Sequence, residues 1–276
     1  MLFRESIKTY KGSLLSGDKN CLYIPPHEML QPFIANYTIS FPSPQNMPDE
    51  YTILPTASST IVITVNSGEI NGSLRGVNTK ALNVGNHINK LNLLLLIEFH
   101  TGGLYPFLSV EQSELVDASF ALNELDKKLM KTLKFELEKS SMIETLVEAL
   151  DKIFISRLMN LKTMFDFSPV MRNIIKRHGI VNMNDASLPF FYSERQTRRL
   201  FLRYVGINPK KLTRIVRANY ALRLIKNGKD SFLDVTEETG YFDQPHFIHE
   251  FKMIHGITPQ EYKQKMSVFY NDNTKM

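Results

Sequence analysis

The stretch "GYFDQPHFIHEFKMIHGITPQEY", residues 240–262, decides how this chain is interpreted. His246 and His249 lie three residues apart, so a helix would place both on one face, and His255 follows near the helix end. A catalytic zinc site would also need a third ligand and a general base in an enclosed pocket. Asp243 is better explained as the N-cap of the helix. We therefore predict displayed histidines and no metal site.

The same pattern occurs twice in the C-terminal part of the chain. Each copy has a short helical segment, a tight break, a longer helix and a Gly-x-x-Pro exit, at 206–209 and at 256–259. Two helices joined by a tight turn describe a helix-turn-helix, whose second helix enters the DNA major groove. We predict a first motif at about 181–205, a linker helix at about 209–226 and a second motif at about 231–255.

Polar side chains are expected on the outward faces of both longer helices. Arginine contacts guanine edges and phosphates, glutamine can read adenine, and histidine can donate to phosphates or base acceptors. A basic run is often only a solvated face, but four arginines within nine residues repel one another without a counter-charge. The predicted DNA-contacting residues are Arg195, Gln196, Arg198, Arg199 and Arg203 in the first motif, and Gln244, Pro245, His246, His249 and Lys252 in the second.

The predicted linker helix has an apolar seam and basic residues on its other side. At 1.5 Å per residue its length is about 25 Å, so it could hold two reading helices roughly one DNA turn apart. Arg217 has two possible roles. It could brace the two motifs through a buried ion pair, which we favour, or contact a phosphate.

The remaining sequence indicates a second, different domain. The 276 residues suit about two domains, and the first 110 contain β-branched segments separated by Gly and Asn, typical of an antiparallel sheet in a barrel or sandwich. Residues 115–162 are helical in pattern, and Ser141 with Glu144 has capping-box spacing. We predict an α+β protein: a β-rich sensor domain with helices at 1–163 and an all-α DNA-binding domain at 164–276.

Charge and cysteine content restrict the function further. Residues 168–276 hold eighteen Lys or Arg against ten Asp or Glu, whereas residues 1–167 hold fifteen against eighteen. The basic half is therefore the one expected to meet a polyanion. One cysteine, Cys21, excludes an internal disulfide and a thiolate metal cluster. With neither a signal-peptide pattern nor an apolar run of membrane-span length, we expect a cytoplasmic protein without membrane contact.

The residues of the second motif resemble the AraC/XylS family of bacterial transcription regulators. The resemblance covers about residues 168–265 and is carried by Gly240, Tyr241, Asp243, Phe247, Phe251, Lys252, Gly256, Thr258, Pro259 and Tyr262, with Pro209, Arg217, Ala221 and Leu224 in the linker. It implies two helix-turn-helix units joined by a long helix. By position it implies base contacts from Arg195, Arg198, Arg199, Gln244, Pro245, His246 and His249, and structural roles for Arg217, Ala221, Gly240, Phe247, Phe251, Gly256 and Pro259.

This chain departs from the family pattern at several positions. Thr236 replaces a small alanine in the second motif; in the first, Ser187 takes the corresponding place, Phe191 replaces the turn glycine, and Thr197 replaces a buried leucine. Pro189 would shorten or bend the supporting helix. These departures concern the pose of the first reading helix.

The N-terminal half resembles, more weakly, the sensor half of some of these regulators, which implies effector binding, dimerisation or both. No effector-binding residue can be assigned. Glu98 on an otherwise apolar strand could face a pocket or solvent, and the aromatic residues could line a pocket or form the core.

The expected partners follow from this interpretation. They are double-stranded DNA, a small-molecule effector, a second copy of the chain, and RNA polymerase if the protein activates transcription. We expect no cofactor and no catalytic residue. A DNA-repair methyltransferase would need an activated thiolate, and Cys21 has no neighbouring His or Arg. A nonspecific architectural DNA-binding protein would not need a separate β domain.

Overall fold

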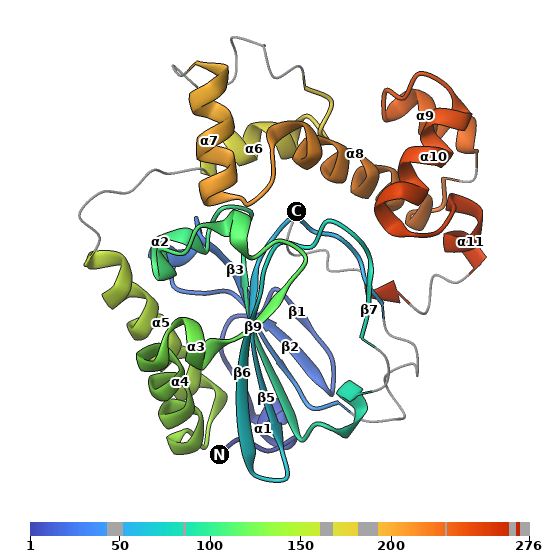
Figure 1. The fold of residues 1–276 in the computed structure, drawn as a ribbon. Helices are drawn as coiled ribbons and strands as arrows, with labels where there is room; N and C mark the ends of the chain where they lie inside the picture. The colour runs from blue at the N-terminus through green and yellow to red at the C-terminus, as the bar shows by residue number, and fades with distance from the viewer. Residues whose placement is uncertain are drawn as a thin grey trace.

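A computed structural model describes residues 1–42, 52–84, 87–160, 168–181, 193–229, 231–264 and 269–270. Its N-terminal part is built on an antiparallel sheet and its C-terminal part is helical, as predicted (Figure 1). The predicted domain boundary at 163/164 falls among residues outside these ranges.

Within the described ranges, seven strands form the main sheet, in the spatial order β1, β2, β3, β8, β5, β6, β9. All six ladders are antiparallel. The strands are β1 (Ser16–Gly17), β2 (Cys21–Ile24), β3 (Ile34–Ser40), β5 (Thr60–Asn66), β6 (Glu69–Arg75), β8 (Leu93–Phe99) and β9 (Ser119–Ala121). The three central strands, β3, β8 and β5, are rich in β-branched and leucine residues and are mostly buried, as expected of strands covered on both faces.

A second, smaller sheet joins distant parts of the chain. It contains β4 (Thr52–Ile53), β7 (Leu82–Asn83) and β10 (Phe269–Tyr270), and β10 pairs with β4 in parallel. This pairing of C-terminal residues with the N-terminal half was not predicted from the sequence.

One face of the main sheet carries the N-terminal hydrophobic core. Tyr37, Ile97 and Ile61 lie opposite one another on three neighbouring strands and are completely buried. Two helices, α4 (Lys127–Lys139) and α5 (Ile143–Met159), contribute their apolar faces to this core (Figure 1). Shorter elements are α1 (Ser6–Thr9), η1 (Glu28–Leu30), η2 (His87–Lys90), α2 (Tyr105–Leu108), η3 (Gln112–Glu114) and α3 (Leu122–Leu125).

The predicted start of α5 was wrong. Its N-cap is Met142, which makes no side-chain cap hydrogen bond, and the Glu144 carboxylate instead accepts from the Lys11 backbone N–H at 2.8 Å. The capping-box pattern failed because a tertiary contact took the glutamate. The expected apolar face of the helix is present, with Ile143, Leu146, Leu150 and Phe154 fully buried.

The C-terminal helices form two small cores that share one long helix. The helices are α6 (Ser168–Lys176), α7 (Glu194–Tyr204), α8 (Pro209–Lys226), α9 (Phe232–Glu238), α10 (Gln244–His255) and α11 (Pro259–Gln264). The helix α8 spans the residues predicted for the linker. Its first half packs with α6 and α7, and its second half packs with α9, α10 and α11. The helices α7 and α10 therefore lie at opposite ends of α8 (Figure 1).

The N-terminal half also contributes to both of these cores. Ala57 and Val77 pack into the core around α7, and Leu54 packs into the core around α10. The Asn219 side chain on α8 donates a buried hydrogen bond to the Pro55 carbonyl at 2.8 Å. Because of these contacts α8 is buried on more sides than the single seam predicted from the sequence; Ala218, Asn219 and Leu222 are buried as well.

Candidate nucleic-acid interface

The helix α7 presents most of its surface to solvent. Ser193 caps it: the Ser193 hydroxyl accepts from the Gln196 N–H at 3.3 Å, and the Gln196 side chain accepts from the Ser193 N–H at 3.1 Å. Phe201 is the buried anchor on the opposite side. Arg195, Arg199 and Arg203 follow at intervals of four and lie in one exposed stripe, with Arg198 exposed beside it.

The C-terminal end of α7 is attached to the N-terminal half. The Arg203 Nε donates to Glu111 Oε1, just before η3, at 3.0 Å. The Tyr204 and Tyr105 rings lie 4.3 Å apart. Gly206 approaches the Gln112 carbonyl so closely that a Cβ atom would lie 2.7 Å from its oxygen, and its φ of 89° also favours glycine. Of the predicted DNA-contacting arginines on α7, Arg203 is thus held by an internal carboxylate.

The helix α10 buries more side chains than α7 does. Asp243 caps it by accepting from the His246 N–H at 2.8 Å, and Gly256 ends it with a left-handed φ of 76°. Phe247, Phe251, Ile254 and His255 are buried. The outward face carries the predicted residues Pro245, His246, His249 and Lys252, which are exposed, while Gln244 is half-buried at the edge of that face.

The three histidines of this segment do not come together. His255 is 1% exposed and its ring lies 4.4 Å from that of Phe251, on the inner side of α10, whereas His246 and His249 are exposed. Burial lowers the pKa of His255 to about 4, so this side chain is neutral at physiological pH. Among the residues that the structure describes, no cluster of three potential metal ligands occurs.

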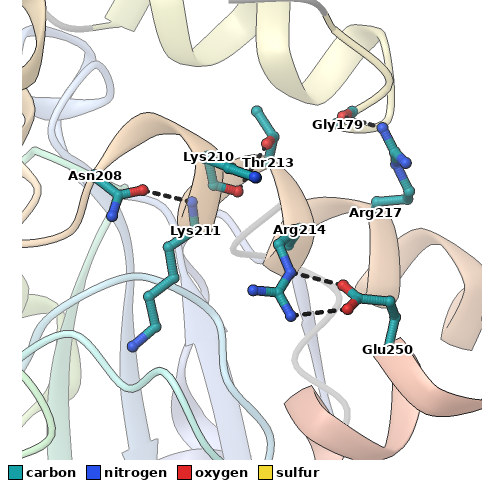
Figure 2. Close-up of polar contacts among 8 residues, drawn as sticks. All are labelled: Gly179, Asn208, Lys210, Lys211, Thr213, Arg214, Arg217 and Glu250. Atoms are coloured by element: carbon teal, nitrogen blue, oxygen red, sulfur yellow. Dashed lines mark hydrogen bonds and ion pairs between the residues drawn. The ribbon is translucent and has the colours of Figure 1, made fainter.

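The linker helix braces the second unit through an ion pair that was not predicted. The Arg214 guanidinium on α8 donates to both carboxylate oxygens of Glu250 on α10, at 2.6 and 2.9 Å (Figure 2). Such a two-point contact fixes orientation as well as distance. Glu250 was overlooked because nothing in its local sequence pattern identifies a partner 36 residues away.

Arg217 contacts both units, and within the described residues it does so without a carboxylate partner. Its Nη2 donates to the Gly179 carbonyl at 3.3 Å, at the end of the α6 segment (Figure 2). Its guanidinium also lies over the Tyr241 ring, 5.4 Å from the centroid, in the second unit. In the described part of the chain, a carbonyl and an aromatic face are the groups that Arg217 contacts, and the bracing ion pair stays a prediction.

Tyr220, one further turn along the same side of α8, makes the next bridge. Its ring stacks on that of His178 with 3.7 Å between centroids, and its hydroxyl donates to Glu238 on α9 at 2.6 Å. Lys229 also pairs with Glu238. Arg214, Arg217 and Tyr220 follow at intervals of three, so one ridge of α8 contacts both helix-turn-helix units.

The departures from the family pattern have partial explanations. Thr236 is buried, and its hydroxyl donates to the Phe232 carbonyl at 2.6 Å, which satisfies the polar atom that alanine would lack. Thr197 is half-buried on α7. Ser187, Pro189 and Phe191 lie outside the described residues. Of the remaining residues with predicted structural roles, Ala221 and Pro259 are buried and Gly240 has a φ of 67°.

A buried polar cluster lies on the main sheet of the N-terminal half. Glu98 is 1% exposed, and its carboxylate accepts from the Asn36 amide at 2.7 Å and the Thr38 hydroxyl at 2.8 Å. Glu98 therefore does not face solvent. The aromatic residues Phe33, Tyr37, Phe41, Phe99 and Phe107 belong to the hydrophobic core.

Cys21 has the wrong environment for an activated nucleophile. Burial raises the pKa of its thiol to about 11, which disfavours the thiolate. In the described part of the chain, none of the helices combines the length and apolar character of a membrane span.

Comparisons with known proteins converge on the C-terminal segment. Residues 189–265 match the family model of a helix-turn-helix domain. The chain is 32% identical over 85 residues to the HTH-type transcriptional regulator YisR of Bacillus subtilis, covering 31% of this chain and 30% of that protein. It is 40% identical over 67 residues to the HTH-type transcriptional regulator YidL of Escherichia coli, covering 24% and 23%. The matches thus span less than a third of each relative.

Among solved structures, ToxT from Vibrio cholerae is similar over 84% of this chain and 93% of its own, with 14% identity and a TM-score of 0.38. That likeness is too low to carry an argument about function. The sequence matches identify residues 189–265 as a helix-turn-helix domain, in agreement with the paired helices around α8.

Proposed function

We propose that this protein is a sequence-specific DNA-binding transcription regulator and not an enzyme. The observation that carries the proposal is the exposed face on each of two capped helices, α7 and α10, within the helix-turn-helix domain. Each face carries side chains able to hydrogen-bond to base edges or phosphates. The opposite face is anchored by Phe201 in α7 and by Phe247 and Phe251 in α10. The enzyme alternative has little support, since the Cys21 thiol is held protonated by burial.

The two reading helices are proposed to meet adjacent segments of the major groove. The 18 residues of α8 give it a length of about 27 Å, somewhat less than the ~34 Å of one DNA turn. The ridge formed by Arg214, Arg217 and Tyr220 holds both units against α8. A braced linker favours a fixed half-site spacing over a variable one.

The N-terminal half is proposed to regulate DNA binding, through a small-molecule effector, through dimerisation, or through both. The supporting observation is its direct attachment to α7 by Glu111 and Tyr105. A change in this half could thereby alter the position of the first reading helix. RNA polymerase would be a further partner if the protein activates transcription.

A selection of bound duplexes from a random library tests the proposal. We expect the full chain to enrich two short half-sites centred about 10 base pairs apart, roughly one turn of DNA. Gln244→Ala should then cost about 1–3 kcal/mol at one position of one half-site and relax the base preference there. Equal weakening on every sequence would make Gln244 a phosphate contact. Enrichment of no sequence at all would reject sequence-specific binding.

A further inference from the structure

Phe242 is an apolar side chain that the fold leaves in solvent. It is 92% exposed, compared with 68% for Phe3 and 58% for Met253. Single exposed apolar residues are common on protein surfaces, so exposure alone has no functional meaning. Its place in the fold is what makes this residue informative.

The backbone around Phe242 is held firmly on both sides. Tyr241 is 7% exposed, with its ring 5.6 Å from that of Phe247 and beneath the Arg217 guanidinium. Asp243 is fixed by its cap hydrogen bond to the His246 N–H. The Phe242 ring therefore projects from an ordered turn immediately before α10, and little further ordering of the backbone is needed when it binds a partner.

That position is the leading end of the second reading helix. The N-terminal residues of such a helix are the ones that approach base edges in the major groove. The outward face of α10 also differs in chemistry from that of α7. Among its described residues, α10 has a single Lys or Arg, Lys252. The apolar side chains of Pro245 and Met253 are also exposed on this helix. By contrast, the outward side of α7 carries Arg195, Arg198, Arg199 and Arg203.

An apolar side chain at this position has one matching feature in the major groove. Thymine alone among the four bases presents a methyl group there, at C5, and an apolar side chain that covers it reads thymine without a hydrogen bond. We propose that Phe242 packs against the 5-methyl group of a thymine in the half-site read by α10. This inference rests on the proposed function and identifies a specificity-determining residue within it.

The test uses the full chain and the duplex recovered by selection. Thymines in the second half-site are replaced one at a time by deoxyuridine, which lacks the 5-methyl group and keeps the same base-pairing groups. At one position we expect the affinity of the unaltered protein to fall about four-fold, the equivalent of one buried methyl group. Phe242→Ala should bind the thymine duplex more weakly by at least that factor and should no longer distinguish thymine from uracil there.

Two further variants control for shape and folding. Phe242→Leu keeps an apolar side chain and should retain most of the thymine preference. Leu233→Ala removes a 56% exposed apolar side chain from α9 in the same unit and should leave the preference unchanged. Circular dichroism melting curves confirm that each variant is folded.

The outcomes separate this inference from the function on which it rests. Selective binding with equal affinity for thymine and uracil throughout the second half-site would overturn the role of Phe242 and leave the regulator proposal standing. Full thymine preference in Phe242→Ala would do the same. A chain that binds all duplexes equally would overturn both proposals.

Discussion

The two reading helices differ in how they are held and in what they present. The described residues of α7 include one that is fully buried, Phe201, and its outward side carries four arginines. The helix α10 buries four residues and is fixed to α8 by the Arg214–Glu250 pair. Its outward side is mostly histidine and apolar. If the proposed function holds, α7 would supply charge for affinity, and α10 would supply a firmly oriented surface for discrimination between sequences.

The largest expected effect is the dependence of DNA binding on salt. A protein that neutralises six or more phosphates loses at least about 10³-fold in affinity between 50 and 200 mM salt, because condensed counterions are released. If α7 supplies most of the phosphate contacts, Arg195→Ala and Arg199→Ala should each reduce the steepness of log affinity against log salt by about one. Gln244→Ala on α10 should leave the slope unchanged.

Fluorescence anisotropy titrations at five salt concentrations measure these slopes. The matched control is Lys134→Ala, which removes an exposed charge from α4 in the N-terminal half. It should leave the salt slope unchanged. A slope lowered equally by the arginine variants and by Gln244→Ala would remove the proposed difference between the helices.

Acid should destabilise the second unit because of His255. Burial holds its folded pKa at about 4, below the unfolded value of about 6.5, so the unfolded chain binds the proton more readily at acidic pH. The stability that the neutral His255 side chain contributes to the fold is fully present above pH 6.5 and is lost as the pH falls towards 4. At pH 5 the loss is about 2 kcal/mol relative to pH 8.

Urea unfolding of the chain at pH 5 and pH 8, with and without His255→Gln, measures this contribution. The variant is expected to be less stable at pH 8 and to show a smaller decrease on acidification. Hydrogen exchange at pH 5 should show faster opening in α10 than in α7. Equal acid sensitivity in wild type and variant would place the effect elsewhere.

The next prediction concerns the Arg214–Glu250 ion pair. Because it fixes α10 and not α7, its removal should affect the second unit alone. Glu250 is mostly buried and Arg214 is about two-fifths exposed, so removing either partner should cost about 1.5 kcal/mol of folding stability. The double variant should cost little more than either single one. In DNA footprints, protection of the second half-site should weaken before that of the first. Lys210→Ala, an exposed residue on the same helix, is the control.

The sequence predicts local contacts better than contacts between residues that are far apart in the chain. The bounds of α8 and the Asp243 cap follow from patterns within a few residues, and the structure has them where the patterns indicated. Arg214 with Glu250 and Arg203 with Glu111 are pairs 36 and 92 residues apart, and no local pattern identifies such partners.

Residue type alone also does not predict which phenylalanines are buried. Phe247 is buried and Phe242 is 92% exposed, although they lie five residues apart in one motif. Phe247 lies four residues before Phe251, and this helical spacing places both on the buried side of α10. Phe242 precedes the Asp243 cap, so helical periodicity does not apply to it, and its exposure depends on how the turn packs.

The smallest expected effect concerns the ion pair between α7 and the N-terminal half. The Arg203–Glu111 pair is nearly half exposed on both sides, and such exposed pairs contribute little to stability. If Arg203 contacts a phosphate in the complex, this pair must first break. Glu111→Gln removes that competition and should strengthen DNA binding by up to about five-fold, with Glu114→Gln, three residues on and also exposed, as the control. Arg203→Ala should weaken binding and make Glu111→Gln ineffective in the double variant. Weaker binding in Glu111→Gln would instead mean that the pair positions α7 for DNA, and that Arg203 acts on the N-terminal half and not on the phosphate backbone.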